Sequence, residues 1–118
     1  MVFVVDDDTV LRMAYASAIH KLGFKVETFS DGAEALHGLK KQTPDLIVLD
    51  MLMPNLDGLG FLKQLRRNTE HKKLKVIVVS NFESMPETAD YDIVAYLTKQ
   101  VNTPDKLAER VAKELQEA

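Results

Sequence analysis

The sequence contains no cysteine and no tryptophan among its 118 residues. The lack of cysteine excludes disulfide bonds, thiolate metal sites and a cysteine nucleophile. No apolar run approaches the roughly 18–20 residues that a membrane-spanning helix requires, and no signal peptide precedes the first apolar run. We therefore expect a cytoplasmic protein that does not contact a membrane.

The chain also lacks a large net charge, because it contains 15 Lys and Arg residues and 18 Asp and Glu residues. This balance argues against a protein that coats nucleic acid. The most basic segment, residues 66–75, has no aromatic side chains that could stack on bases, so we expect no direct nucleic-acid contact. The length fits one domain of about 100–150 residues, and we assign it to residues 1–118.

Short apolar runs recur along the chain and predict five β-strands. Val2–Val5, Leu46–Leu49 and Val76–Val79 are unbroken, which is typical of parallel strands covered on both faces. Phe24–Phe29 alternates apolar and polar residues and is expected at an edge of the sheet, and Ile93–Leu97 is the fifth strand.

Segments with helical periodicity fill the intervals between these runs. Asp8 or Thr9 is predicted to cap the first helix, and Ser30 or Asp31 the second. Gly23 is predicted to end the first helix. Two further helices are expected over Gly58–Arg67 and from Pro104, after the cap residue Thr103.

This alternation of strands and helices predicts an α/β fold, because right-handed crossovers give a doubly wound parallel sheet with helices on both faces. The interval between Ser80 and Lys99 is polar and contains Pro86. The fourth helix, which falls there, is therefore expected to be short or irregular. Ligands of such folds bind beyond the carboxyl ends of the strands.

Polar residues follow the predicted strands at these ends. The first strand leads into Asp6 and Asp7, the third ends at Asp50, the fourth at Ser80, and the fifth leads to Lys99. Carboxylates a few Å apart repel by about 4 kcal/mol per pair at an effective dielectric near 20, and Mg²⁺ relieves this repulsion. A carboxylate beside such a metal can act as nucleophile toward a phosphoryl group, giving an aspartyl-phosphate.

The segments VFVVDDD, LIVLDMLMPNLDG, VIVVS and YLTK resemble the motifs of response-regulator receiver domains, the CheY-like phosphoacceptors of two-component signalling. The resemblance covers essentially the whole chain and implies a flavodoxin-like sheet in the order 2-1-3-4-5. It implies that Asp50 accepts a phosphoryl group from a sensor histidine kinase or a phosphotransfer protein of a phosphorelay. It also implies a downstream protein partner, and a homodimer is possible. The resemblance fits either a stand-alone regulator or one domain of a longer protein.

The same resemblance implies a role for each residue of the site. The Mg²⁺ ligands would be Asp6, Asp7, Asp50 and the backbone carbonyl of Leu52. Ser80 and Lys99 would contact the phosphoryl group, and Tyr96 would be the switch residue that follows Ser80 inward. The chain departs from the family at Gln100, where a proline in a cis peptide bond is usual, so the reach of Lys99 could differ.

Two other functions stay open at this point. The segment Asp6–Val10 resembles the nucleophile motif of haloacid-dehalogenase-like phosphatases, with Asp6 as nucleophile and Asp8 as acid, but that family would give Asp50 no role. A pseudo-receiver would keep the fold as a phosphorylation-independent interaction module. As a receiver the chain is not a metabolic enzyme, although it would catalyse its own phosphorylation and dephosphorylation.

Overall fold

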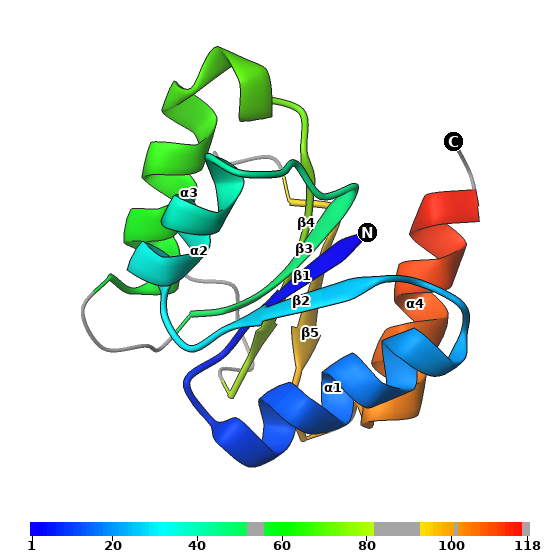
Figure 1. The fold of residues 1–118 in the computed structure, drawn as a ribbon. Helices are drawn as coiled ribbons and strands as arrows, with labels where there is room; N and C mark the ends of the chain where they lie inside the picture. The colour runs from blue at the N-terminus through cyan, green and yellow to red at the C-terminus, as the bar shows by residue number, and fades with distance from the viewer. Residues whose placement is uncertain (52–55, 82–92, 101, 117–118) are drawn as a thin grey trace.

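Five parallel strands form the centre of the structure, a computed structural model that describes residues 1–51, 56–81, 93–100 and 102–116. The strands lie in the order β2-β1-β3-β4-β5 (Figure 1). The predicted parallel sheet and its order are therefore confirmed, with β2 at an edge. The strands are β1 (Val2–Val5), β2 (Val26–Phe29), β3 (Leu46–Asp50), β4 (Lys75–Ser80) and β5 (Ala95–Thr98).

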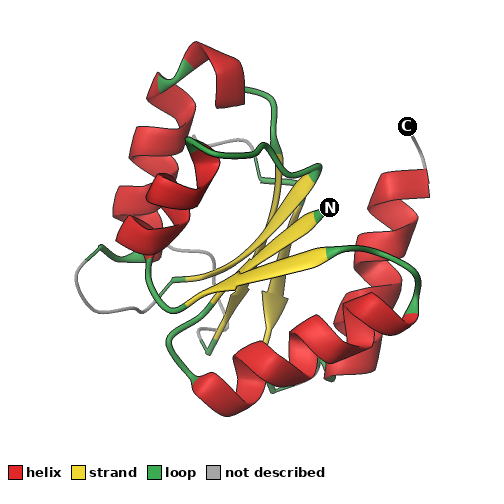
Figure 2. Ribbon diagram, in the orientation of Figure 1, coloured by secondary structure: helices red, strands yellow, loops and turns green. Residues whose placement is uncertain are grey.

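Helices cover both faces of this sheet, as expected for a doubly wound fold. The α-helices in the described ranges are α1 (Thr9–Lys21), α2 (Gly32–Leu39), α3 (Gly58–Arg67) and α4 (Pro104–Gln116), and a short 3-10 helix, η1 (Thr69–His71), follows α3. Helices α1 and α4 pack on one face, and α2 and α3 on the other (Figure 2). The helix expected between β4 and β5 falls on residues 82–92, outside the described residues.

The length and the apolar character of these helices bear on membrane insertion. Within the part of the chain that the structure describes, no helix is both long enough and apolar enough to span a bilayer.

Side-chain caps begin the helices where the sequence predicts them. Asp8 caps α1, because its Oδ1 accepts a hydrogen bond from the backbone N–H of Leu11 at 3.1 Å. Asp31 caps α2 in the same way. Gly23 follows the end of α1 with a φ of +97°, a conformation that favours glycine, so the predicted stop is confirmed.

The central strands are apolar throughout because both of their faces are buried. Under α1 and α4 lie Val2, Val4, Leu46, Val48, Ile77 and Val79. Under α2 and α3 lie Phe3, Val5, Ile47, Leu49, Val76 and Val78. None of these side chains is more than 2% exposed, so each strand contributes alternately to two separate cores.

The edge strands begin later than the apolar pattern predicts. β2 begins at Val26, two residues late, because its register pairs Val26 with Val2, near the start of the chain. β5 spans Ala95–Thr98 rather than residues 93–97, and its last residue pairs with the last residue of β4. The partner strand, not apolar character alone, determines where an edge strand begins and ends.

Candidate functional site

The carboxyl edge of the sheet brings together the acidic residues that the sequence predicts for the site. Asp6 follows β1 and Asp50 ends β3, and they are only 2% and 5% exposed, whereas Asp7 is exposed. One carboxylate oxygen from each of the three lies within 4.8 Å of the other two. Three carboxylates at this spacing suit a hard divalent cation such as Mg²⁺, which prefers oxygen ligands.

Lys99, just after β5, supplies a positive charge to this cluster. Its Nζ lies 3.2 Å from Asp6 Oδ2 and 3.4 Å from Asp50 Oδ2. The Lys99–Gln100 peptide bond is trans, so the absence of the usual proline does not prevent this reach. Three carboxylates facing one paired ammonium leave a surplus of negative charge, which a divalent cation would offset.

The protonation of Lys99 follows from two opposing effects. Burial lowers the pKa of Lys99, because a buried ammonium loses hydration. The charges of Asp50 and Asp6, together with hydrogen bonds to both carboxylates, raise it more, and the net pKa lies above the ordinary value of 10.5. Lys99 therefore carries a full positive charge at neutral pH.

Hydrogen bonds hold both the side chain and the backbone of Asp6. Its Oδ1 accepts a hydrogen bond from the Asp8 N–H at 2.9 Å, and its own N–H donates to the carbonyl of Phe29 at 3.1 Å. The guanidinium of Arg12 donates to the Asp6 carbonyl at 2.9 Å. The sequence motifs do not reveal Arg12, and the only signal for it is its place near the start of the helix that begins beside the site.

Ser80 and Tyr96 lie on the two strands beyond β3. Ser80 ends β4, is fully buried, and accepts a hydrogen bond at its carbonyl from the Lys99 N–H at 2.8 Å. Tyr96 pairs with Val78 in register and packs, half-buried, against the core under α2 and α3. The structure thus places Ser80 at the same sheet edge as the carboxylates, while Leu52, the other expected ligand, lies outside the described residues.

Tyr15 is a second residue near the site that the motifs do not reveal. It lies in α1, is 1% exposed, and packs in the core that the sheet forms with α1 and α4. Burial raises the pKa of the Tyr15 phenol. The charge of Lys99 lowers this pKa and the charges of Asp6 and Asp50 raise it, so that the net pKa lies above its ordinary value. The phenol therefore lies within the electrostatic field of the site, although sequence periodicity marks it only as a helix residue.

Sequence comparison identifies the family to which this geometry belongs. The family model described as the response regulator receiver domain matches residues 2–112. The chain belongs to this family. The receiver domain is 34% identical over 122 residues to the DNA-binding transcriptional regulator NtrC of Escherichia coli (strain K12), in an alignment that covers 99% of this chain and 26% of NtrC. It therefore spans about a quarter of that relative.

Solved structures have the same architecture as this receiver domain. The receiver domain of the Francisella response regulator 1452 matches with a TM-score of 0.87 and 31% identity, over 98% of this chain and 96% of that one. The response regulator TrrA of Thermotoga maritima, solved in complex with Mg²⁺ and BeF, matches with a TM-score of 0.81 and 27% identity, over 95% and 96% of the two chains. The receiver domain is thus part of the response-regulator family of two-component signalling.

Proposed function

We propose that this receiver domain is a phosphoacceptor switch that takes a phosphoryl group onto Asp50. The observation that carries the proposal is the cluster of the Asp6, Asp7 and Asp50 carboxylates, two of them buried and paired with the ammonium of Lys99. Such a cluster suits a divalent cation and an incoming phosphoryl group, both of which need charge neutralisation more than covalent assistance. The donor would be a sensor histidine kinase or a phosphotransfer protein.

In the proposed reaction, a carboxylate oxygen of Asp50 attacks the phosphorus atom. The new O–P bond forms as the bond between phosphorus and the donor's histidine nitrogen breaks, and the nitrogen keeps the electron pair. Lys99, which lies 3.4 Å from Asp50, would neutralise the phosphoryl oxygens, and the Ser80 hydroxyl would donate a hydrogen bond to one of them. This reaction requires positioning and charge neutralisation rather than a strong base.

The cation site would be formed by the carboxylates of Asp6, Asp7 and Asp50, with the backbone carbonyl of Leu52 as a further ligand. Mg²⁺ bound there would offset the charge of the carboxylates and of the phosphoryl oxygens. The structure of TrrA with Mg²⁺ and BeF supports this assignment, because that protein has the same fold. The residues present fit the ion in number, spacing and chemical type.

Phosphorylation would convert the site into a switch by adding a charge of about −2. Lys99 and Ser80 would reorganise around the new group, and Tyr96, on the adjacent strand, would report the change to a downstream protein or a second copy of the chain. The domain would work in the cytoplasm, as a signalling protein that catalyses its own phosphorylation and dephosphorylation. It would have no metabolite as substrate.

The test is labelling with acetyl phosphate, with and without Mg²⁺, followed by intact mass and by peptide mapping of the modified residue. We expect one phosphoryl group on Asp50, formed only with Mg²⁺ and absent from Asp50→Asn. Asp45→Asn is the matched control, because Asp45 pairs with the chain's amino terminus at the opposite end of β3. It should label like the unsubstituted protein.

Two other outcomes would replace the proposal. A phosphoryl group on Asp6 that persists in Asp50→Asn would point to the haloacid-dehalogenase-like phosphatase. No label on any residue, in a protein that binds Mg²⁺ and is folded, would point to the pseudo-receiver.

A further inference from the structure

The loop that leaves Asp50 returns to the sheet through unusually close contacts. The N–H of Gly58 donates to the carbonyl of Met51 at 3.1 Å, which ties the start of α3 to the end of β3. A Cβ atom at Gly58 would lie 2.7 Å from the Asp50 carbonyl oxygen and 2.7 Å from Met51 Cα. Only glycine fits there, so the first residue of α3 lies directly against the backbone of the phosphoacceptor.

Leu56, on the returning limb of this loop, lies between two more glycines. A Cβ atom at Gly32, the first residue of α2, would lie 2.7 Å from the Leu56 carbonyl oxygen and 3.3 Å from its Cβ and Cγ. A Cβ atom at Gly60 in α3 would lie 2.7 Å from Leu56 Cδ1. We call Gly32 and Gly60 the Leu56 socket.

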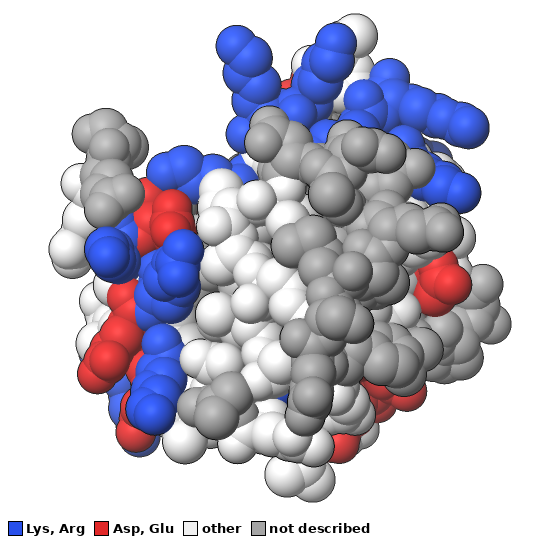
Figure 3. Space-filling model, turned by 180° about the vertical axis from the view of Figure 1, so that it is seen from behind, with Lys and Arg blue, Asp and Glu red and all other residues white. Residues whose placement is uncertain are grey.

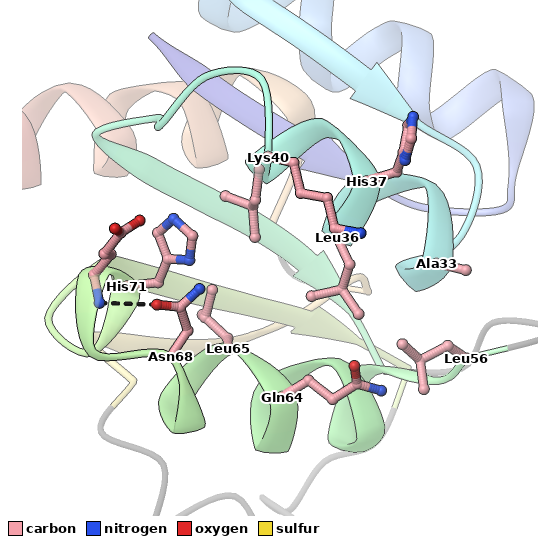
Figure 4. Close-up of a pocket in the computed structure, with 11 residues that line it drawn as sticks. Ala33, Leu36, His37, Lys40, Leu56, Gln64, Leu65, Asn68 and His71 are labelled. Carbon is pink, nitrogen blue, oxygen red and sulfur yellow. Dashed lines mark hydrogen bonds between the residues drawn. The ribbon is translucent and has the colours of Figure 1, made fainter.

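The socket holds Leu56 where α2 and α3 come together. The side chain lies at one end of a groove of about 810 Å³ between these helices, beside Ala33 and Gln64 (Figure 4). It is half-buried and packs against the core under α2 and α3. Asp57, the next residue, is fixed in turn because its Oδ1 accepts a hydrogen bond from the Gly60 N–H at 2.8 Å.

We propose that Leu56 and its socket position Asp50 for metal binding and phosphoryl transfer. Gly58 lies against the Asp50 carbonyl and donates to that of Met51, and Leu56, two residues before Gly58, lies in the socket. Helix α2 contributes no acidic ligand to the site, yet through Gly32 it determines how closely the loop can approach β3. The inference rests on the proposed function, and it adds positioning residues that have no contact with the ion.

The first test is Gly32→Ala, which pushes a methyl group into the backbone of Leu56. We expect affinity for Mg²⁺, titrated as MgCl₂, to fall about tenfold, the size of effect seen when groups that orient metal ligands are removed. The Gly58 amide, measured by hydrogen exchange without Mg²⁺, should exchange faster, since its bond to Met51 is loosened.

The matched control is Gly23→Ala. Alanine there is strained by the φ of +97° but meets no atom within 4 Å, so the variant loses stability without touching the loop. It should keep the Mg²⁺ affinity and the Gly58 exchange rate of the unsubstituted protein, relative to its own global unfolding. If Gly23→Ala and Gly32→Ala change Mg²⁺ affinity equally, or neither changes it, the proposal is wrong.

A second pair of variants works even if Gly32→Ala fails to fold. Leu56→Ala should weaken Mg²⁺ binding severalfold, because the segment that leads to Gly58 loses its packing against Gly32 and Gly60. Gly60→Ala should weaken it in the presence of Leu56 but restore it in the Leu56→Ala background, because the added methyl group then fills the vacated space. Independent effects of the two substitutions would refute the socket.

These measurements separate the two proposals. Neither Mg²⁺ affinity nor Gly58 exchange requires phosphorylation. If the variants behave as expected but acetyl phosphate labels no protein, the socket is supported and the phosphoacceptor function is refuted. If Asp50 is labelled normally in every variant and the Mg²⁺ affinities are equal, the function is supported and the socket is refuted.

Discussion

The two ends of the sheet use cationic side chains in different ways. At the carboxyl edge, Lys99 pairs with the carboxylates of Asp6 and Asp50. At the amino end of β4, the guanidinium of Arg66 donates to three backbone carbonyls, those of His71, Lys72 and Leu74, at 3.2, 3.1 and 2.8 Å. Lys75 Nζ donates to the carbonyl of Glu114 at 2.6 Å.

The difference separates a site from a structural tie. Backbone carbonyls are neutral acceptors with fixed positions, so Arg66 and Lys75 keep their positive charge and serve to connect chain segments. Lys99 pairs with the two buried carboxylates, Asp6 and Asp50, and Asp7 lies close to both. The surplus negative charge of the three carboxylates favours an added cation. Lys and Arg crowd the end of the molecule where α3, η1 and the start of β4 lie (Figure 3), and two of them, Arg66 and Lys75, have structural partners there.

The largest effect should come from Lys99→Ala. Removing the ammonium leaves Asp6 and Asp50 buried without their partner, and we expect the free energy of unfolding at pH 7 without Mg²⁺ to fall by about 3 kcal/mol. Urea unfolding measures this. Added Mg²⁺ should stabilise the variant more than the unsubstituted protein, because the carboxylates no longer pair with a competing cation.

Lys113→Ala, at an exposed position of α4, is the control for Lys99→Ala and should change the unfolding free energy little. A Lys99→Ala protein as stable as this control would mean that the carboxylates do not depend on the ammonium.

A smaller effect is expected at the opposite end, from Arg66→Met. The variant keeps an apolar stem but loses the bonds to three carbonyls, and stability should fall by about 2 kcal/mol. Mg²⁺ affinity should not change, which is the result that distinguishes this end from the site. Arg67→Met is the control, since Arg67 is the exposed neighbour on the same helix. Any weakening of Mg²⁺ binding in Arg66→Met would contradict the division into site and structural tie.

Lys75→Met should have a weaker effect still. It removes one hydrogen bond between the start of β4 and the end of α4, and we expect a loss of about 1 kcal/mol. Amide exchange in the last turn of α4 should rise, while exchange at the carboxyl edge stays the same. The exposed neighbour Lys73 provides the control substitution, and equal losses in the two variants would mean that the contact with Glu114 contributes nothing.

The last prediction concerns how the free energy of unfolding changes at alkaline pH, and at neutral pH its effect is the smallest. Folding raises the pKa of Lys99 above 10.5 and that of Tyr15 above 10.0. Both groups therefore hold their protons more tightly in the folded state than in the unfolded state. Their contribution to the free energy of unfolding is present below the pKa values of the unfolded state, and it is lost as pH rises through the pKa values of the folded state. Urea unfolding should show stability falling above about pH 10, less steeply in Tyr15→Phe. A fall of equal steepness in that variant would exclude Tyr15 as a source.

Much of the fold follows from local pattern. The unbroken runs of β1, β3 and β4 indicate strands buried on both faces, and Asp8, Asp31 and Gly23 mark helix ends through their own backbone preferences. The bounds of β2 and β5 were less accurately predicted, because they depend on pairing with a neighbouring strand. Residues 82–92, where a short or irregular helix is expected, lie outside the described part of the chain.

The residues of the site also divide into those that the sequence predicts and those that it does not. Asp6, Asp7, Asp50 and Ser80 could be predicted because each follows or ends a strand, and the carboxyl ends of parallel strands share one edge. Their roles in phosphoryl transfer, and that of Tyr96 in switching, stay predictions.

Arg12 and Tyr15 lie outside the motifs, and Leu56 lies within LIVLDMLMPNLDG without a role that the motif assigns to it. Their places near the site depend on how α1, α2 and α3 pack on the sheet.

By itself, the sequence determined that this chain forms a parallel α/β sheet with acidic residues along one edge. Hydrophobic periodicity and capping are local properties, so a single sequence contains them. Only the tertiary structure decided that Lys99 lies within 3.4 Å of two carboxylates on other strands, and that Gly32 lies against the loop of Asp50. Such contacts join residues far apart in sequence, and side-chain packing across strands and helices sets their distances.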